Sequence, residues 1–240
     1  MLETLRQTGK CSSIDLPKRF EILLGEEDNW ASIASRREKL NRFCAQCIQI
    51  PDDDRIQIPL DKIVRHLDLC ADTLKAIIRE KAWIQTEQDG WFNSYYDNHG
   101  IPLECGVPGQ ERMMLTGQVF AILGGAAAKS EIPQIYHAAR RLLYAPQVGG
   151  FRLNTQLDSE DFQIGRMLAF AYGHKENGAV FSHMSVMFAY ALYSRGYARE
   201  GFSAIEPIWR LVLDSKKSRI YPGIPEYFAP DGRGMYPYLT

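Results

Sequence analysis

The stretch GAVFSHMSVMFAYALYSRGYAREGFSAIEPIWRLVLD, residues 178–214, predicts two antiparallel helices joined by a tight turn at Gly196. The first helix, 178–196, carries no charged residue until Arg195, whereas the second, 198–214, mixes apolar and charged residues at helical spacing. A helix that is apolar all round is buried, and an amphipathic helix covers it from outside. Glycine often ends a helix because it readily adopts a left-handed conformation. The stretch therefore predicts a hairpin of one inner and one outer helix.

Two further helix pairs are predicted upstream. Residues 113–128 carry no charge and are followed closely by the amphipathic segment 132–144, which repeats the inner and outer pattern. Apolar residues at helical spacing also predict helices over 30–51 and 59–84, joined by the short polar stretch PDDDRIQI. Strand patterns are few, so the sequence predicts an all-α chain of three helical hairpins. Three hairpins are half of a six-hairpin toroid, the (α/α)6 barrel, and the periodicity leaves a layered α-solenoid as the alternative.

Three long segments, 82–111, 145–177 and 215–240, follow the three pairs. In antiparallel hairpins stacked in sequence, such connections leave from the same end, so we expect the segments to meet on one surface. Connections longer than about 12 to 15 residues are usually functional. The sequence therefore predicts the functional surface at this end.

Composition narrows the class of protein. The chain has 240 residues, 45% of them hydrophobic, which is enough to bury a sizeable core. Its 28 basic and 29 acidic residues give a formal charge of -1, so no net field attracts nucleic acid or an anionic membrane. The N-terminus lacks a signal-peptide pattern, and no stretch reaches the roughly 20 apolar residues that a membrane span needs. We therefore expect a cytoplasmic protein without nucleic-acid or membrane partners.

The five cysteines indicate free thiols in a reducing compartment. Cys44 and Cys47 form a C-x-x-C motif on a predicted helix, but a zinc site needs about two further soft ligands nearby. Cys70 and Cys105 stand alone in the sequence and supply no second motif. We therefore predict core or surface thiols at these positions.

Two loops offer candidate ligand-binding groups. DGWFNSYYDNHG, residues 89–100, combines aromatic rings with amide and carboxylate groups, the mixture by which proteins hold sugars, and the alternative is a turn anchored by aromatic residues. In VGGFRLNTQLDSEDFQIG, residues 148–165, Arg152 and Asn154 are candidate ligands, and a polar loop around paired glycines is the alternative. Composition leaves both choices open.

The stretch GHKENGAVFSHM, residues 173–184, places two histidines, a lysine, a carboxylate and an amide just before a predicted helix. A metal site would use His174, Glu176 and His183, but the spacing of the two histidines matches no metal motif. A second interpretation makes Asn177 the helix cap. The third interpretation, which we favour, places Lys175, Glu176 and His183 at the N-terminal end of the inner helix. There the lysine and glutamate would grip adjacent hydroxyls, and the histidine would bind an anion.

Six motifs, in chain order, together resemble one enzyme family: DGWFNSYYDNHG, RMMLTGQVFAILGG, GGFRLNT, GHKENGAVFSHM, SRIYPGIPEYF and GRGMYPYLT. From about residue 55 to the end, the chain resembles the C-terminal part of the catalytic domain of cellobiose-phosphorylase-like proteins. These are the inverting glycoside phosphorylases of glycoside hydrolase family 94, formerly glycosyltransferase family 36. Among members of this family, the motif sequences most resemble those of the 1,2-β-oligoglucan phosphorylases. The resemblance implies an (α/α)6 barrel.

The resemblance also implies a reaction. Inorganic phosphate attacks the anomeric carbon of a β-linked gluco-oligosaccharide while an aspartic acid protonates the glycosidic oxygen, and a sugar 1-phosphate is released. By the same resemblance, Lys175 and Glu176 match residues that hold the glucosyl hydroxyls, His183 matches a phosphate-binding histidine, and Thr240 matches a phosphate-binding threonine. Phosphate is the co-substrate, and neither a metal nor an organic cofactor is implied.

The sequence departs from the family at the catalytic acid. That aspartate lies in a D-W-N-D-like motif upstream, and residues 1–58 contain no such motif, so no catalytic residue is assigned. We expect residues 55–240 to be part of the barrel domain, truncated at both ends, and residues 1–54 to be a helical segment of uncertain match.

Two functional classes follow from this departure. The chain is either an enzyme part that needs a complementary chain, or an inactive remnant that binds carbohydrate weakly or associates with copies of itself. An incomplete barrel would leave apolar inner-helix residues partly uncovered, among them Val119, Phe120, Met187 and Phe188.

Overall fold

A computed structural model describes Thr4 and residues 12–24, 32–49, 54–157, 162–220 and 223–236. These residues are mostly helical, with four small antiparallel sheets. The chain divides into two compact units, Met1–Ile77 and Ile78–Thr240. Over the ranges described, no helix is both long enough and apolar enough to cross a membrane.

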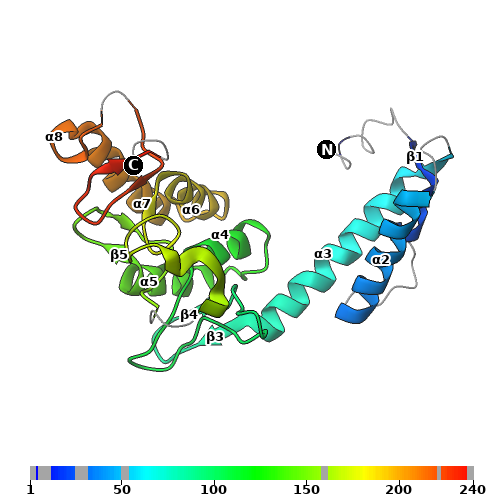
Figure 1. Ribbon diagram of the computed structural model, residues 1–240, viewed down its shortest axis with the longest axis horizontal. Helices are drawn as coiled ribbons and strands as arrows, with labels where there is room; N and C mark the ends of the chain where they lie inside the picture. Colours follow the sequence, from blue (N-terminus) through cyan, green and yellow to red (C-terminus); the bar gives the residue numbers. More distant parts are fainter. Residues whose placement is uncertain are drawn as a thin grey trace. The chain divides into compact units, whose positions relative to one another are not determined.

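The first unit is built from a two-stranded sheet and two helices (Figure 1). Strand β1 (Ser13–Pro17) pairs antiparallel with β2 (Arg55–Pro59), and the short 3-10 helix η1 (Lys18–Leu24) follows β1. Helices α2 (Ile33–Gln49) and α3 (Leu60–Ala82) confirm the two helices predicted over 30–51 and 59–84. The buried residues Leu24, Ile58 and Ile63 form a small core of this unit.

Helix α2 lies beside α3, as the predicted pairing requires (Figure 1). Burial lowers the pKa of Lys39 on α2, and the charge interaction with Cys70 on α3 acts in the opposite direction. Cys44 and Cys47 are exposed on α2, while Cys70 is half-buried, and all three are free thiols. The C-x-x-C pair therefore lies on the helix surface.

The second unit contains two helical hairpins, and both were predicted from the sequence. Their helices are α4 (Leu115–Leu123) with α5 (Ile132–Leu142), and α6 (Ser182–Ser194) with α7 (Ala198–Leu213), followed by the single turn α8 (Ser215–Ser218). Gly196 between α6 and α7 has a φ of 88°, the left-handed conformation expected of a glycine stop. Pro207 lies inside α7.

The expected stack of three hairpins is not found within one unit. The first predicted pair, α2 with α3, makes its contacts mostly among residues 1–77, and only the end of α3 belongs to the second unit. The boundary between the units therefore falls inside α3. The division of the sequence at residues 54 and 55 follows the family resemblance, not compactness, and stays a prediction.

Short strands correct the expectation of an all-α chain. In the second unit they form three sheets: β3 (Trp83–Gln85) with β4 (Gly90–Phe92), β5 (Tyr144–Ala145) with β6 (Gly150–Phe151), and β7 (Val180–Phe181) with β8 (Tyr227–Phe228) and β9 (Gly234–Met235). A further 3-10 segment, η2, covers Phe162–Ala169. Each strand has two or three residues, which is too short to show an alternating pattern. For this reason the strands of the second unit were not predicted from the sequence.

The core of the second unit lies between α4, α5 and α6. Its aromatic centre is Phe151 and Phe188, whose rings meet edge to face with centroids 5.2 Å apart. The first hairpin adds Leu115, Ile122 and Ile135, all fully buried. The inner helices α4 and α6 thus pack on each other through the faces that the apolar pattern predicted.

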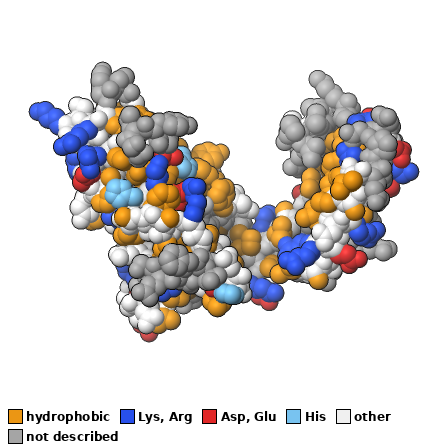
Figure 2. Space-filling model, in the orientation of Figure 1, with side chains coloured by type: hydrophobic (Ala, Val, Ile, Leu, Met, Phe, Trp, Pro, Cys, Tyr) orange, Lys and Arg blue, Asp and Glu red, His pale blue; other side chains and the backbone are white. Residues whose placement is uncertain are grey.

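These inner helices are nevertheless not buried all round. On α4, Val119 is fully buried but Phe120 is 55% exposed, and on α6, Phe188 is fully buried but Tyr190 is 64% exposed. Successive residues of a helix point about 100° apart, so each helix has a core face and a solvent face. The sequence predicted that all four of these side chains are partly uncovered. This prediction is confirmed for Phe120 and wrong for Val119 and Phe188, while Met187 is half-buried. Figure 2 shows hydrophobic side chains at the surface over α4 and α6.

A buried glutamate ties the start of α4 to the loop before it. Glu104 is 3% exposed, and its carboxylate accepts hydrogen bonds from Met114 N (2.7 Å), Gln118 Nε2 (3.3 Å), the Ser94 hydroxyl (2.8 Å) and Ser94 N. Burial raises the pKa of Glu104 to about 7, against the lowering effect of these donors. This core group therefore changes its charge near neutral pH.

The pH dependence of stability tests this assignment. Because the folded pKa of Glu104 lies above the ordinary value of 4.5, its contribution is fully present below pH 4.5 and is lost as the pH rises through about 7. In the unmodified chain, we expect the free energy of unfolding to fall by about 3 kcal/mol as the pH rises across this range. In Glu104→Gln this fall should be absent. Urea denaturation at a series of pH values measures it. The control Glu87→Gln, at an exposed position, should leave the decrease unchanged, and an unchanged decrease in Glu104→Gln would contradict the assignment.

Candidate functional site

The three long segments meet, as the sequence predicted. The Tyr95 hydroxyl of the first segment donates a hydrogen bond to the carbonyl oxygen of Ile164 in the second (3.0 Å). Lys175 of the second segment pairs with Glu226 of the third, with Nζ 3.8 Å from Oε2. Strand β7, next to the second segment, also pairs with β8 of the third. The polar stretch 173–178 lies where these segments come together.

Residues 173–178 form a tight turn with an unusual backbone. Gly173 and Gly178 have φ values of 92° and 76°, and Lys175 has a φ of 47°, which is rare for a residue with a side chain. The turn is closed by hydrogen bonds from Gly173 N to Asn177 O (2.6 Å) and from Asn177 N to His174 O (3.0 Å). The glycines thus allow a left-handed Lys175 at the tip of the turn.

Side-chain hydrogen bonds hold this turn in place. The fully buried Asn154 accepts a hydrogen bond from Gly178 N (2.8 Å), and Arg152 Nη1 donates to Gly178 O (3.0 Å). Asn177 is also buried, and its Nδ2 donates to the carbonyl oxygen of Phe170 (2.8 Å). Arg152 and Asn154 therefore support the turn, a role that the sequence did not predict.

The interpretation of Asn177 as the cap of the inner helix is wrong. Helix α6 begins at Ser182, four residues beyond the turn, and strand β7 intervenes. The cap position is Phe181, whose side chain makes no capping hydrogen bond. Asn177 instead stabilises the turn, because its side-chain amide donates to the backbone carbonyl of Phe170.

Gly178 gives a direct test of the turn. A Cβ at Gly178 would lie 2.3 Å from Tyr172 Cε2, whereas a Cβ at Gly100, with a similar φ of 80°, meets nothing within 4 Å. We expect Gly100→Ala to cost about 1 to 2 kcal/mol through backbone strain alone. Gly178→Ala should cost roughly 1 to 3 kcal/mol more, through the clash. Thermal unfolding of both variants measures the difference, and equal losses would show that the turn does not pack on Tyr172.

A charged cluster surrounds the tip of the turn. Glu176 forms an ion pair with Arg166 of η2 through its Oε1, and Lys175 forms one with Glu226. The Lys175 ammonium also lies 5.4 Å from the ring centroid of Tyr227. Glu176 Oε2 and Glu226 Oε2 are both buried and have no hydrogen-bond donor within the part of the chain that the structure describes. The cluster therefore keeps two acceptor oxygens unused.

The electrostatics of the cluster favour an ionised Glu176. Burial alone would raise the pKa of Glu176, but the hydrogen bond from Arg166 and the charge of Lys175 outweigh it and lower the pKa. Burial raises the pKa of the Tyr227 hydroxyl, and the charges of Glu226 and Glu176 raise it further. Both carboxylates thus raise the pKa of the same hydroxyl.

Replacing Arg166 tests this coupling. Arg166→Gln removes the strongest group that lowers the pKa of Glu176, so we expect this pKa to rise. Titration of the Glu176 side-chain carboxyl by NMR measures the change. The matched control is Arg210→Gln, which breaks a similar ion pair with Glu206 on α7. A Glu176 pKa that does not move in Arg166→Gln would contradict the ion pair.

His183 lies in the first turn of α6 and is exposed. Its ring contacts Phe181 edge to face at 5.3 Å, and Phe181 contacts Tyr227 at 5.4 Å, so aromatic contacts link it to the ring beneath Lys175. Beside it, the Ser182 hydroxyl is buried and has no hydrogen-bond partner among the described residues. Three of the predicted site residues, Lys175, Glu176 and His183, are therefore brought to one region, while Thr240 lies outside the described residues.

Arg166, Glu226 and Tyr227 were not predicted from the sequence. The motif SRIYPGIPEYF marks the segment that holds two of them, but nothing in its local pattern indicates a partner for Glu226. That partner, Lys175, is remote in the sequence. Only the pairing of β7 with β8 brings the two together.

The aromatic loop 89–100 divides into a buried and an exposed part. Trp91, Phe92 and Asn93 are buried, which supports the alternative of a turn anchored by aromatic residues. Tyr95 and Tyr96 are 38% and 48% exposed. Within the described ranges, no three His, Cys, Asp or Glu side chains gather closely enough to hold a metal ion.

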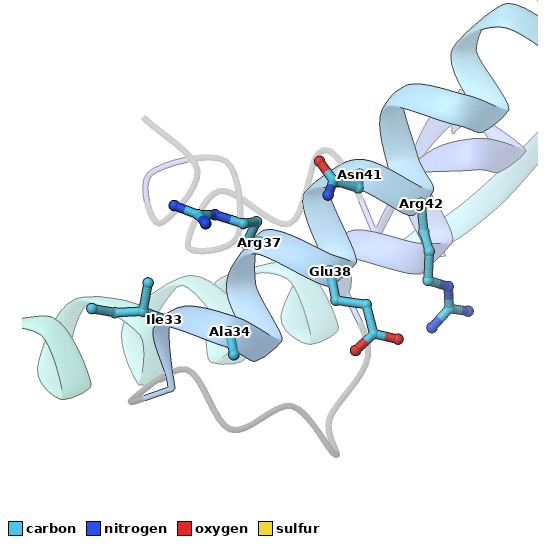
Figure 3. Close-up of a pocket in the computed structure, with 6 residues that line it drawn as sticks. All are labelled: Ile33, Ala34, Arg37, Glu38, Asn41 and Arg42. Atoms are coloured by element: carbon cyan, nitrogen blue, oxygen red, sulfur yellow. The ribbon is translucent and has the colours of Figure 1, made fainter.

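A hollow on the first unit is a poor candidate for a site. It is lined by side chains of α2 alone, Ile33, Ala34, Arg37, Glu38, Asn41 and Arg42 (Figure 3). In Figure 3 the polar groups of these residues spread around the helix and do not converge. None of the predicted site residues lies there, so we place the candidate site at the turn 173–178.

Comparisons with known proteins add no assignment. No protein-family model and no curated protein matches the sequence. Two solved structures from Thermus thermophilus are distantly similar, each at 14% identity: an uncharacterized conserved protein (TM-score 0.44) and a GH63 mannosylglycerate hydrolase in complex with Tris (TM-score 0.42). The matches cover 86% of this chain and 42% and 41% of those chains, so this chain spans about two fifths of their length. Scores this low assign neither a fold nor an activity.

Proposed function

We propose that this chain is part of an inverting glycoside phosphorylase and carries the groups that hold the sugar and the phosphate. Lys175 and Glu176 bind hydroxyls of a β-linked gluco-oligosaccharide, and His183 binds inorganic phosphate. The hairpins α4–α5 and α6–α7 then belong to the wall of an (α/α)6 barrel, with the turn 173–178 at its mouth. The family resemblance of the motifs supports this proposal, and the geometry of the turn supports the sugar-binding role.

The observation that carries the proposal is the unused Oε2 of Glu176, buried beside the Lys175 turn. A buried carboxylate oxygen without a donor is costly, so it is expected to bind a ligand that donates. A sugar hydroxyl can donate to Glu176 and can accept from the ammonium group of Lys175. The left-handed backbone at Lys175 fits the same idea, because strained residues cluster at functional sites.

The phosphate role of His183 rests on its place at the start of α6. The first turn of a helix is the positive end of its dipole, which favours an anion, although the first N–H of α6, that of Ser182, already donates to Glu226 O. The exposed imidazole adds a donor at this position.

In the proposed reaction, a phosphate oxygen forms a bond to the anomeric carbon as the glycosidic bond breaks. The proton that the leaving sugar oxygen needs comes from a carboxylic acid. No residue of this chain is assigned to that step. This chain contributes the positions of the two reactants.

Separate binding measurements test the two roles. By calorimetry, we expect Lys175→Ala and Glu176→Gln to weaken binding of a β-1,2-linked gluco-oligosaccharide at least about tenfold and to leave phosphate binding unchanged, because each removes a charge-assisted hydrogen bond. His183→Ala should do the reverse. The exposed Lys129 and His99 give the control variants Lys129→Ala and His99→Ala, which should bind both ligands normally.

Two outcomes would decide against the proposal or refine it. Failure of the unmodified chain to bind either ligand would contradict it and favour the second candidate, a remnant that associates through the exposed apolar side chains of α4 and α6, such as Phe120 and Tyr190. Sedimentation of the chain at several concentrations would detect such association. Phosphate-dependent release of glucose 1-phosphate would establish the chain as an active enzyme part.

A further inference from the structure

We infer that Glu226 is a third sugar-binding residue of this site, and that the site therefore selects a neutral ligand with at least two neighbouring hydroxyl donors. This inference rests on the proposed function and adds a residue from a segment distant in the sequence. Its grounds are the position of Glu226, the state of its carboxylate and the charge balance around it.

The backbone of Glu226 is fixed on both sides. Its N–H donates to the carbonyl oxygen of Met235 (3.1 Å), at the edge of β9, and its own carbonyl accepts from Ser182 N (3.0 Å), the first residue of α6. The side chain therefore starts from a rigid position between the β7–β8–β9 sheet and the helix that carries His183. Binding residues held on rigid elements lose little entropy when a ligand arrives.

The carboxylate of Glu226 is only partly neutralised. Lys175 Nζ lies 3.8 Å from Oε2, a distance that allows charge attraction but exceeds a hydrogen bond. That Oε2 is buried and, among the described residues, has no hydrogen-bond donor. The same is true of Glu176 Oε2, and both carboxylates affect the hydroxyl of Tyr227. Two unused acceptors thus lie near one ring.

The charges define the class of ligand. Lys175 and Arg166 bring two positive charges to the cluster, and Glu176 and Glu226 bring two negative charges, so the cluster has no net charge to balance with an ion. An anion would be repelled by both carboxylates. Two acceptors and one ammonium donor match two hydroxyl donors and one oxygen acceptor, which adjacent hydroxyls of a sugar ring present together.

Binding of a β-1,2-linked gluco-oligosaccharide to the full chain tests this inference. Glu226→Gln keeps the size of the side chain but removes its charge, and Glu226→Asp keeps the charge but withdraws it by one methylene. We expect both to weaken oligosaccharide binding at least about tenfold, with phosphate binding unchanged. The same oligosaccharide with every hydroxyl methylated should not bind. The matched control is Glu206→Gln, because Glu206 is also ion-paired and has a similar side-chain exposure, 33% against 35% for Glu226.

The outcomes separate this inference from the proposed function. If Lys175→Ala and Glu176→Gln lose binding while both Glu226 variants bind normally, the inference is overturned and the proposed function stands. If Glu226→Asp binds the oligosaccharide with full affinity and Glu226→Gln does not, Glu226 acts only through its charge on Lys175. This result would also overturn the inference. If the unmodified chain binds no oligosaccharide, the proposed function fails and the inference with it. Circular dichroism melting of each variant confirms that the fold is kept.

Discussion

The strip Leu153–Thr155 joins the start of α4 to the segment that leads into β7, and the position of the candidate site depends on it. Leu115 N, at the start of α4, donates to Leu153 O (2.7 Å), and Leu153 N donates to Ala179 O (3.0 Å), just before β7. The side chain of Asn154 then binds Gly178 N and fixes the turn that carries Lys175. A buried amide is costly unless its hydrogen bonds are made, so this strip tolerates few alternative arrangements. The position of the candidate site follows from it.

The carboxylates of the second unit fall into two groups with different chemistry. Asp89 has a side chain with no exposure, yet it is fully engaged: Arg141 donates to both of its oxygens (3.1 Å each), and Thr86 Oγ1 donates as well (2.9 Å). Glu104 is likewise surrounded by donors. Glu176 and Glu226 differ, because each keeps a buried oxygen that receives no donor from the described residues. Satisfied buried carboxylates stabilise a fold, whereas unsatisfied ones beside a strained turn favour a binding role.

Prediction from the sequence was best for elements that local pattern determines. The hairpins α4–α5 and α6–α7 and the glycine stop at Gly196 follow from helical periodicity and from the conformational freedom of glycine. Prediction failed where partners are distant in the chain. Strands β7 and β8 are each two residues long and pair across the whole of α6 and α7, so no local signal marks them. The same intervening β7 made Asn177 a false helix cap.

The sequence by itself determined that Lys175, Glu176 and His183 precede or begin an apolar helix, and the family resemblance of its motifs is the ground for proposing a sugar and a phosphate as ligands. Only the tertiary structure decided that Arg166 and Glu226 join them, that Asn154 and Arg152 support the turn, and which face of α6 is exposed. The physical reason is that periodicity reports which side of a helix is apolar. Contacts between remote segments depend instead on the packing and backbone pairing of the whole unit, which no local stretch of sequence contains.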